Sequence, residues 1–187
     1  MAVTGPGSAV LFAGRDSSLL PHLEAAFARD NIAAHHVNEP ETLAASGAAG
    51  SNVTRAVLLV NPPSDQAHHL KAFRRLVFDK LRGLVAVMPE GSQILVVVDG
   101  RVGAAVYRPE HRIESIMVRL RAAAAREEAS AVMLNAIFLT GTVDDPTVAQ
   151  RICEATCHGS FPDSGFLVFD EDVRHQSISS AIAEQCS

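Results

Sequence analysis

The chain has 187 residues, of which 48% are hydrophobic and 20% are charged, and its formal net charge is −5. This length and composition predict one globular domain with a sizeable core, and they exclude a disordered chain. The sequence has no block of basic residues, so a nucleic-acid-binding surface is not expected.

The sequence carries no recognisable membrane or secretion signal. Its longest apolar runs are strand-length and fall short of the about 20 residues that a transmembrane helix needs. Residues 1–8 lack the basic and apolar regions of a signal peptide and are expected to form a flexible start. Three cysteines in such a chain are typical of reduced thiols. We therefore expect a cytoplasmic protein with no membrane contact.

Strand-like and helix-like runs alternate along the chain, and Ser18 is expected to cap the first helix. The polar end, from about residue 172 to 187, is expected to form a tail. Because continuous apolar strands need cover on both faces, the pattern predicts an α/β, Rossmann-like, doubly wound parallel sheet in a single domain over residues 1–187. The expected strands are residues 9–13, 33–37, 56–60, 94–98, 131–139 and 165–169, and the expected helices are residues 19–30, 41–49, 65–87, 109–128 and 145–157.

Tyr107 lies between an apolar strand and a long helix that leads into another strand. This order resembles the catalytic half of the short-chain dehydrogenase/reductases. In that family a Tyr-x-x-x-Lys pair begins the helix, and a serine ends the preceding strand. Here His111 stands at the lysine position, and Val98 or Asp99 stands at the serine position. Histidine is mostly neutral at pH 7 and shorter than lysine, so the resemblance implies a shortened member of the fold without its hydride-transfer chemistry.

The resemblance also locates the expected cofactor site, which depends on a Gly-x-x-x-Gly-x-Gly turn after the first strand. Those glycines let backbone amides approach the pyrophosphate of a nicotinamide dinucleotide. Only Gly14 remains here, because Ser18 and Leu20 replace the other two glycines. After the fourth family strand, Asn61 is followed by two prolines in place of the usual Asn-Asn-Ala-Gly. We therefore expect these positions to be vestigial and the chain to bind no NAD(P).

Other reactive residues have simpler interpretations. Cys153 and Cys157 share one helical face next to His158, but the sequence shows no further Cys-x-x-Cys pair to complete a metal site, so buried thiols and no metal are expected. Adjacent histidines on a strand point to opposite faces, so His35 and His36 cannot easily chelate one metal ion together. Both are expected to be solvated. Asp144-Asp145 is expected to cap the following helix.

Two long helices predict a subunit interface, since the family pairs the corresponding helices across a twofold axis. The helix over residues 65–87 has apolar residues on more than one side, whereas a helix with one neighbour needs only one apolar stripe. The alternative is a helix buried within its own domain. The expected interface residues are Leu70, Phe73, Val77, Leu81, Leu84, Ile113, Ile116, Met117 and Leu120.

These features favour a non-catalytic subunit that pairs with an active, NAD(P)-dependent paralogue. The resemblance is to the inactive subunits of heterotetrameric dehydrogenases that act on hydroxyacyl-CoA thioesters. Two alternatives stay open. One is a divergent enzyme that uses Tyr107 and His111 without a dinucleotide, and the other is a self-associating module that binds a small ligand.

Overall fold

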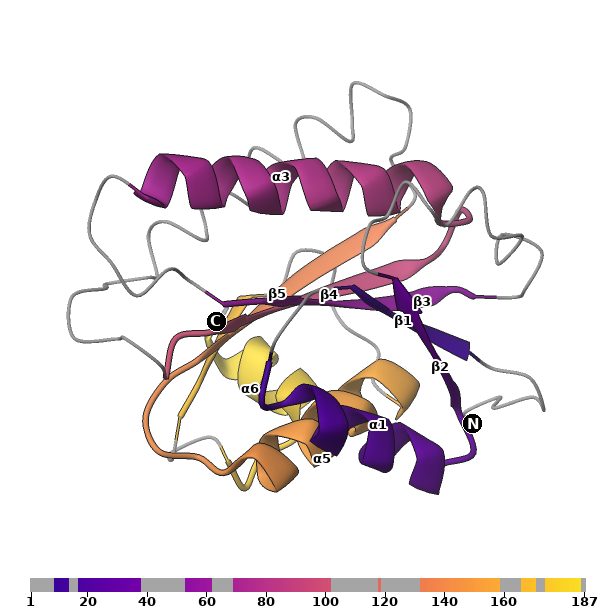
Figure 1. Cartoon of the computed structure of the whole chain (residues 1–187). Helices are drawn as coiled ribbons and strands as arrows, with labels where there is room; N and C mark the ends of the chain where they lie inside the picture. Colours follow the sequence, from indigo (N-terminus) through magenta and orange to yellow (C-terminus); the bar gives the residue numbers. More distant parts are fainter. Residues whose placement is uncertain are drawn as a thin grey trace.

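Six parallel strands form one sheet that is flanked by helices in the computed structural model (Figure 1). The structure describes residues 9–13, 17–37, 53–61, 69–101, 118, 132–158, 166–170 and 174–185. The expected helix over residues 41–49 lies outside this part of the chain, and so does the expected helix over residues 109–128 except for Val118, which is helical. The elements are β1 (Ala9–Ala13), α1 (Leu20–Arg29), β2 (Ala33–Val37), β3 (Arg55–Val60), α3 (His69–Val87), β4 (Gln93–Asp99), β5 (Met133–Leu139), α5 (Asp145–His158), β6 (Phe166–Phe169) and α6 (Ile178–Gln185).

The strand order in the sheet is β2-β1-β3-β4-β5-β6. The chain leaves β1 to form β2 on one side and then crosses back to form β3 on the other side. This reversal defines a switch point at the carboxyl ends of β1 and β3, where open α/β sheets bind their ligands. The predicted doubly wound parallel sheet is therefore confirmed, and so are the six predicted strands.

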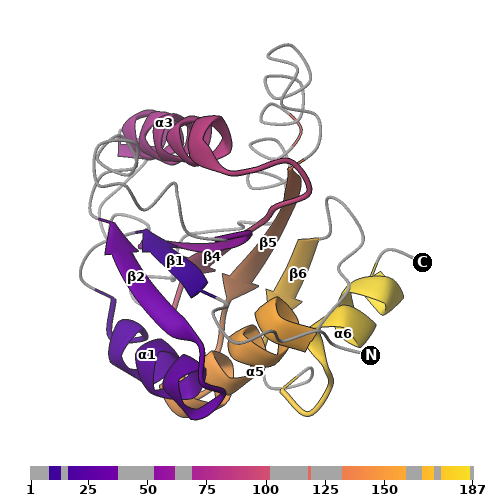
Figure 2. The same cartoon turned by 90° about the vertical axis from the view of Figure 1, so that its right-hand side faces the viewer.

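Helices cover both faces of the sheet, with α3 on one side and α1, α5 and α6 on the other (Figures 1 and 2). The strand β4 shows how the sequence achieves this, because all seven of its residues are buried. Its Leu95 and Val97 join the core under α1 and α5, whereas its Ile94 and Val96 join the core under α3. Alternation of side chains along a strand thus supplies two separate hydrophobic cores.

The apolar stripe of α3 faces the chain's own sheet. Val77, Leu81 and Leu84 are buried in the core formed with β3, β4 and β5. This corrects the predicted interface at these three positions, since side chains that already pack on the sheet are not available to another subunit. Leu70 and Phe73 belong to the same helix, but their side chains lie outside the described part of the structure. The remaining predicted interface residues, Ile113, Ile116, Met117 and Leu120, lie outside it as well.

The opposite side of α3 is polar and faces solvent. Arg75 and Asp79 are exposed and form an ion pair of 3.8 Å one turn apart, and Arg82 is exposed further along the helix. None of the described helices combines the length and the apolar character needed to cross a membrane. The helix is therefore amphipathic, with the chain's own sheet as its apolar neighbour.

The segment after β6 is not the polar tail that the sequence predicts. It forms the helix α6, in which Ile178 and Ala181 are buried in the core shared with α1 and α5. Ser177 starts the helix, because its Oγ accepts a hydrogen bond of 3.2 Å from the backbone amide of Ser180. The chain end thus covers the outer part of the sheet beside β6.

We predict that Ile178→Ala destabilises the protein by about 2–4 kcal/mol, because it removes a fully packed side chain and leaves a cavity. Glu184→Ala, at an exposed position of the same helix, is the matched control and should stay within about 0.5 kcal/mol of the parent protein. Urea denaturation followed by circular dichroism measures both. Equal stability of the two variants would contradict the docking of α6.

Candidate functional site

The candidate site lies at the carboxyl ends of β1, β3 and β4, around the switch point of the sheet. Within the described part of the chain, this edge contains the start of α1, Asn61 after β3, and Asp99 to Arg101 at the end of β4. Asn61 is exposed. Three predicted site residues, Gly14, Tyr107 and His111, lie outside the described residues, so the structure does not place them.

The start of α1 uses its first backbone amides within its own turn. The amide of Leu19 donates to Ser17 Oγ at 3.3 Å, and the amide of Leu20 donates to the Ser17 carbonyl oxygen at 3.1 Å. Pro21 follows and has no N–H group. Anion binding at a helix start depends on amides that point outward without a partner. Leu19, Leu20 and Pro21 together offer no such donor.

The predicted role of Ser18 is wrong in one respect. Leu19 occupies the N-cap position of α1 with helical backbone angles, and no side chain caps the helix. Ser18 is exposed, while Leu19 is completely buried and anchors the turn in the core. Leu20 is partly buried and packs against the same core. Hydrophobic packing of the turn, and not a capping hydrogen bond, therefore fixes where this helix begins.

A network of charged groups occupies the end of β4. The guanidinium of Arg101 donates to both carboxylate oxygens of Asp99, from Nε to Oδ1 at 2.8 Å and from Nη2 to Oδ2 at 2.6 Å. The same Nη2 lies 2.6 Å from Asp145 Oδ1, and Nη1 donates to the Val143 carbonyl oxygen at 2.8 Å. Both side chains of the Asp99–Arg101 pair are largely buried. This network joins β4 to the start of α5.

The network has strong electrostatic consequences. Hydrogen bonding to Asp99, helped by Asp145, raises the pKa of Arg101 above its already high ordinary value, so the cation is permanent. A carboxylate that accepts a bidentate pair from a permanent cation is held in a fixed geometry. Asp99 stands at the strand end where the resemblance places a substrate-binding serine. Both oxygens of Asp99 are bonded to Arg101, which helps to join β4 to α5. The Asp99 carboxylate therefore has little remaining capacity to bind a substrate.

Arg101 and Asp145 were not among the site residues that the sequence predicts. Asp145 was expected to help cap α5, and that role belongs to Asp144 alone. Thr147 donates to both carboxylate oxygens of Asp144, with its amide at 3.1 Å and its hydroxyl at 2.7 Å. These bonds, first that of the hydroxyl, lower the pKa of Asp144. An Asp-Gly-Arg sequence that begins at the last residue of a buried strand is the signal that could have identified Arg101.

Gly100 is required between the two charged residues because of its neighbour on β5. A Cβ atom at this position would lie 2.2 Å from Cζ of Phe138, and other atoms of the same ring are within 3.0 Å. The amide of Gly100 donates to the Leu139 carbonyl oxygen at 3.0 Å, which fixes the backbone next to the ring. The close approach of Gly100 to Phe138 thus sets the path from β4 to Arg101.

A polar groove of about 650 Å³ adjoins this network, lined by the loop after β5, the first half of α5, the end of α1 and the turn before α6. Its arginines are bound within the chain. Arg29 donates to Gln150, and Arg151 donates to Glu154 and to the Arg174 carbonyl oxygen. Glu154 therefore neutralises Arg151, whereas Arg29 is held by a neutral amide.

The other predicted features are found at the surface or in the core. His35 and His36 are exposed on β2 as expected, and His36 Nε2 lies 2.6 Å from Glu24 Oε1. Cys153 and Cys157 are buried on α5, which confirms the prediction of buried thiols. The side chain of His158 lies outside the described part of the structure.

Comparison with solved structures finds the same fold in other proteins, among them two bacterial ones. One is a short-chain dehydrogenase/reductase from Serratia marcescens, which is 13% identical with a TM-score of 0.59, and the match covers 89% of this chain and 98% of that chain. The other is BdcA from E. coli, which is 15% identical with a TM-score of 0.51, covering 82% and 92%. No family model and no curated protein matches the sequence. The chain thus has a shortened Rossmann-like fold of the short-chain dehydrogenase/reductase type.

We predict that Arg101→Met destabilises the protein by about 3 kcal/mol, because it leaves Asp99 and Asp145 without their shared cation in a largely buried place. Arg75→Met breaks the exposed pair with Asp79 and is the matched control, with an expected loss of about 0.5 kcal/mol or less. Denaturant unfolding of both variants measures the difference. A loss below about 1 kcal/mol for Arg101→Met would show that the network does not hold this edge.

We predict that Gly100→Ala destabilises the protein by about 1–3 kcal/mol through overpacking against Phe138. Without that ring, the same change would stabilise the chain by about 0.4–1 kcal/mol, because alanine restricts the unfolded state. Phe138→Leu removes the ring, so the double variant should be more stable than the sum of the two single losses implies. Thermal unfolding of the four proteins tests the coupling, and additive effects would contradict the contact.

Proposed function

We propose that this chain is a non-catalytic subunit that pairs with an active short-chain dehydrogenase/reductase. The observation that carries the proposal is the Asp99–Arg101–Asp145 network at the end of β4. In the fold that the chain adopts, this strand end supports the serine that holds the substrate oxygen. Here a bidentate salt bridge stands at this place and joins β4 to α5, and no serine hydroxyl is present there to bind a substrate.

The start of α1 supports the same proposal. A nicotinamide dinucleotide needs backbone amides at this turn for its pyrophosphate. Ser17 accepts hydrogen bonds from the amides of Leu19 and Leu20, and Pro21 has no amide hydrogen. These bonds support the proposal that the chain has no pyrophosphate site at this turn. In the proposed complex the NAD(P) belongs to the active partner, and this chain binds none.

The proposed complex contains the chain and an active paralogue, as a heterotetramer that oxidises or reduces a hydroxyacyl thioester or a similar alcohol. The burial of one side of α3 limits which residues of this helix could contact the partner subunit. Val77, Leu81 and Leu84 are committed to the chain's own core, so contacts along α3 would use the sides of the helix. Phe78 and Val85 lie on one such side and are only partly buried.

We predict that calorimetric titration of the purified chain with NAD+, NADH, NADP+ or NADPH gives no saturable heat at millimolar concentrations. An intact short-chain dehydrogenase/reductase, titrated in the same way, is the positive control. The physical reason is that the amides of Leu19 and Leu20 already have partners and that Pro21 has no amide hydrogen. Saturable micromolar binding of any of these dinucleotides would overturn the proposal that the chain has lost its cofactor site.

The partner is tested separately. The chain, isolated from its own cells under mild conditions, should carry a stoichiometric companion with an intact Tyr-x-x-x-Lys sequence, identified by mass spectrometry. Dehydrogenase activity should be found in the complex and not in the chain alone. A chain that is isolated without such a companion, or that turns over an alcohol by itself, would contradict the proposal.

A further inference from the structure

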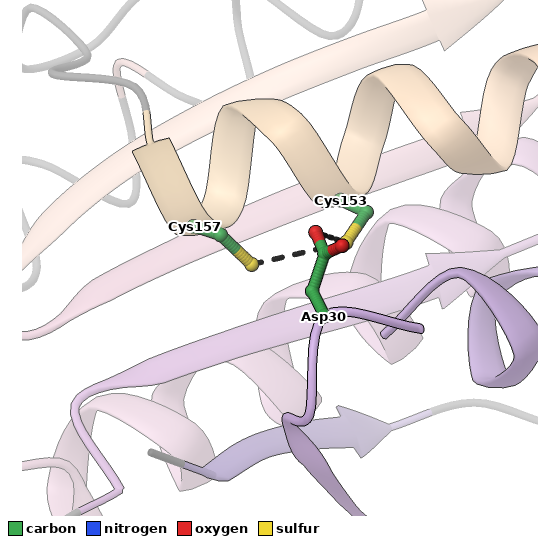
Figure 3. A group of neighbouring side chains, drawn as sticks. All are labelled: Asp30, Cys153 and Cys157. Carbon is green, nitrogen blue, oxygen red and sulfur yellow. Dashed lines mark hydrogen bonds between the residues drawn. The ribbon is translucent and has the colours of Figure 1, made fainter. Parts of the chain in front are cut away.

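Three potential metal ligands meet between α1 and α5, on the face of the sheet that α1, α5 and α6 cover. Asp30 follows the last residue of α1, and Cys153 and Cys157 lie one turn apart on α5. Their ligand atoms all lie within 4.8 Å of one another. Figure 3 shows the two sulfur atoms and the carboxylate of Asp30 converging in the space between the two elements. The group forms from residues that are far apart in the sequence.

The two distances that Cys153 makes within the group are close to those of a tetrahedral zinc site. Zinc binds sulfur at about 2.3 Å and carboxylate oxygen at about 2.0–2.2 Å, so tetrahedral angles place two sulfurs about 3.8 Å apart and a sulfur about 3.6 Å from an oxygen. The two sulfurs here are 3.8 Å apart, and Cys153 Sγ lies 3.4 Å from Asp30 Oδ2. We propose that Asp30, Cys153 and Cys157 form a zinc-binding site that links α1 to α5.

A disulfide between the two cysteines is a poorer fit to the same geometry. Residues four apart on a helix have Cβ atoms about 5–6 Å apart, whereas a disulfide needs about 3.5–4.5 Å. The helix α5 continues through both residues, from Asp145 to His158. Oxidation would therefore have to distort the helix, whereas a zinc ion can bridge the two thiolates without moving the backbone.

A positively charged side chain lies next to the proposed ligands, and one of the ligands is open to solvent. Arg55 at the start of β3 donates from Nη1 to the Cys157 carbonyl oxygen at 3.2 Å. The cysteines are buried, but Asp30 is exposed. A metal ion can therefore enter from the side of Asp30, where a water molecule would complete the four ligands. Two thiolates and a carboxylate give a donor set that favours zinc over magnesium or calcium, which take only oxygen ligands.

Zinc binds cysteine as the thiolate, so metal binding releases the thiol protons. The affinity of the site for zinc should therefore rise with pH.

The test measures zinc bound to the full-length reduced chain. After dialysis against equimolar zinc, mass spectrometry of the metal content should give one zinc per chain, and thermal unfolding should shift to higher temperature and return on chelation. Cobalt in place of zinc should give a thiolate-to-metal charge-transfer band. Cys153→Ala and Cys157→Ala should abolish this band, and Asp30→Asn should weaken binding at least about tenfold.

Two variants serve as matched controls and should bind zinc as the parent does. Cys186→Ser changes the remaining cysteine, which lies outside the described residues, and Glu154→Gln changes an acidic residue of α5 that is bound to Arg151. Far-ultraviolet circular dichroism confirms that each variant folds. If the parent chain binds no zinc, or if Cys157→Ala binds it equally well, the proposal is overturned. Formation of a Cys153–Cys157 disulfide in air by a protein that takes up no zinc would overturn it too.

Discussion

Burial of the sheet on both faces is the constraint from which the rest of the structure follows. All residues of β4 are buried, and so are nearly all residues of β3 and β5. Such strands have no solvent-facing side, so the chain must place α3 on one face and α1, α5 and α6 on the other. This requirement commits Val77, Leu81 and Leu84 of α3 to the core. It also explains why the end of the chain returns as a helix that buries Ile178.

Two polar groups then fix α5 against this frame, one near each end. At its start, Asp145 shares Arg101 with Asp99, which ties the helix to the end of β4. In its last turns, Cys153 contacts Asp30 at the end of α1. Hydrophobic packing alone would permit small shifts of a helix along the sheet, whereas charged and thiol contacts have defined geometries. The position of α5 is therefore specified at both ends.

The sequence predicts most of the fold because its strands are continuous apolar runs, which leave little ambiguity about burial. It fails for α6, where Ile178 and Ala181 are buried although the segment after β6 begins with polar and charged residues. It also assigns the apolar stripe of α3 to a partner, because the pattern of one helix does not reveal which neighbour covers it.

The site was harder to predict for a different reason. Asp99 could be located by its place at the end of a strand, but its pairing with Asp145 through Arg101 depends on how two strand ends meet. The contact of Asp30 with Cys153 spans 123 positions in the sequence. Short-range spacing cannot reveal such a group, which is why the two cysteines alone indicated buried thiols and not a site with three ligands.

The carboxyl edge of the sheet and the space between α1 and α5 differ in how their polar groups are bonded. At the carboxyl edge, groups that could contact a ligand have bonded to one another: Ser17 with the first amides of α1, and Arg101 with two carboxylates. Such mutual satisfaction stabilises the fold and removes the donors that bind a ligand. Between α1 and α5 the arrangement differs, because the two cysteine sulfurs and the Asp30 carboxylate converge within 4.8 Å of one another. Three ligand atoms at such distances can be bridged by one metal ion. The proposed zinc site therefore depends on the packing of α1 against α5 and not on the carboxyl edge of the sheet.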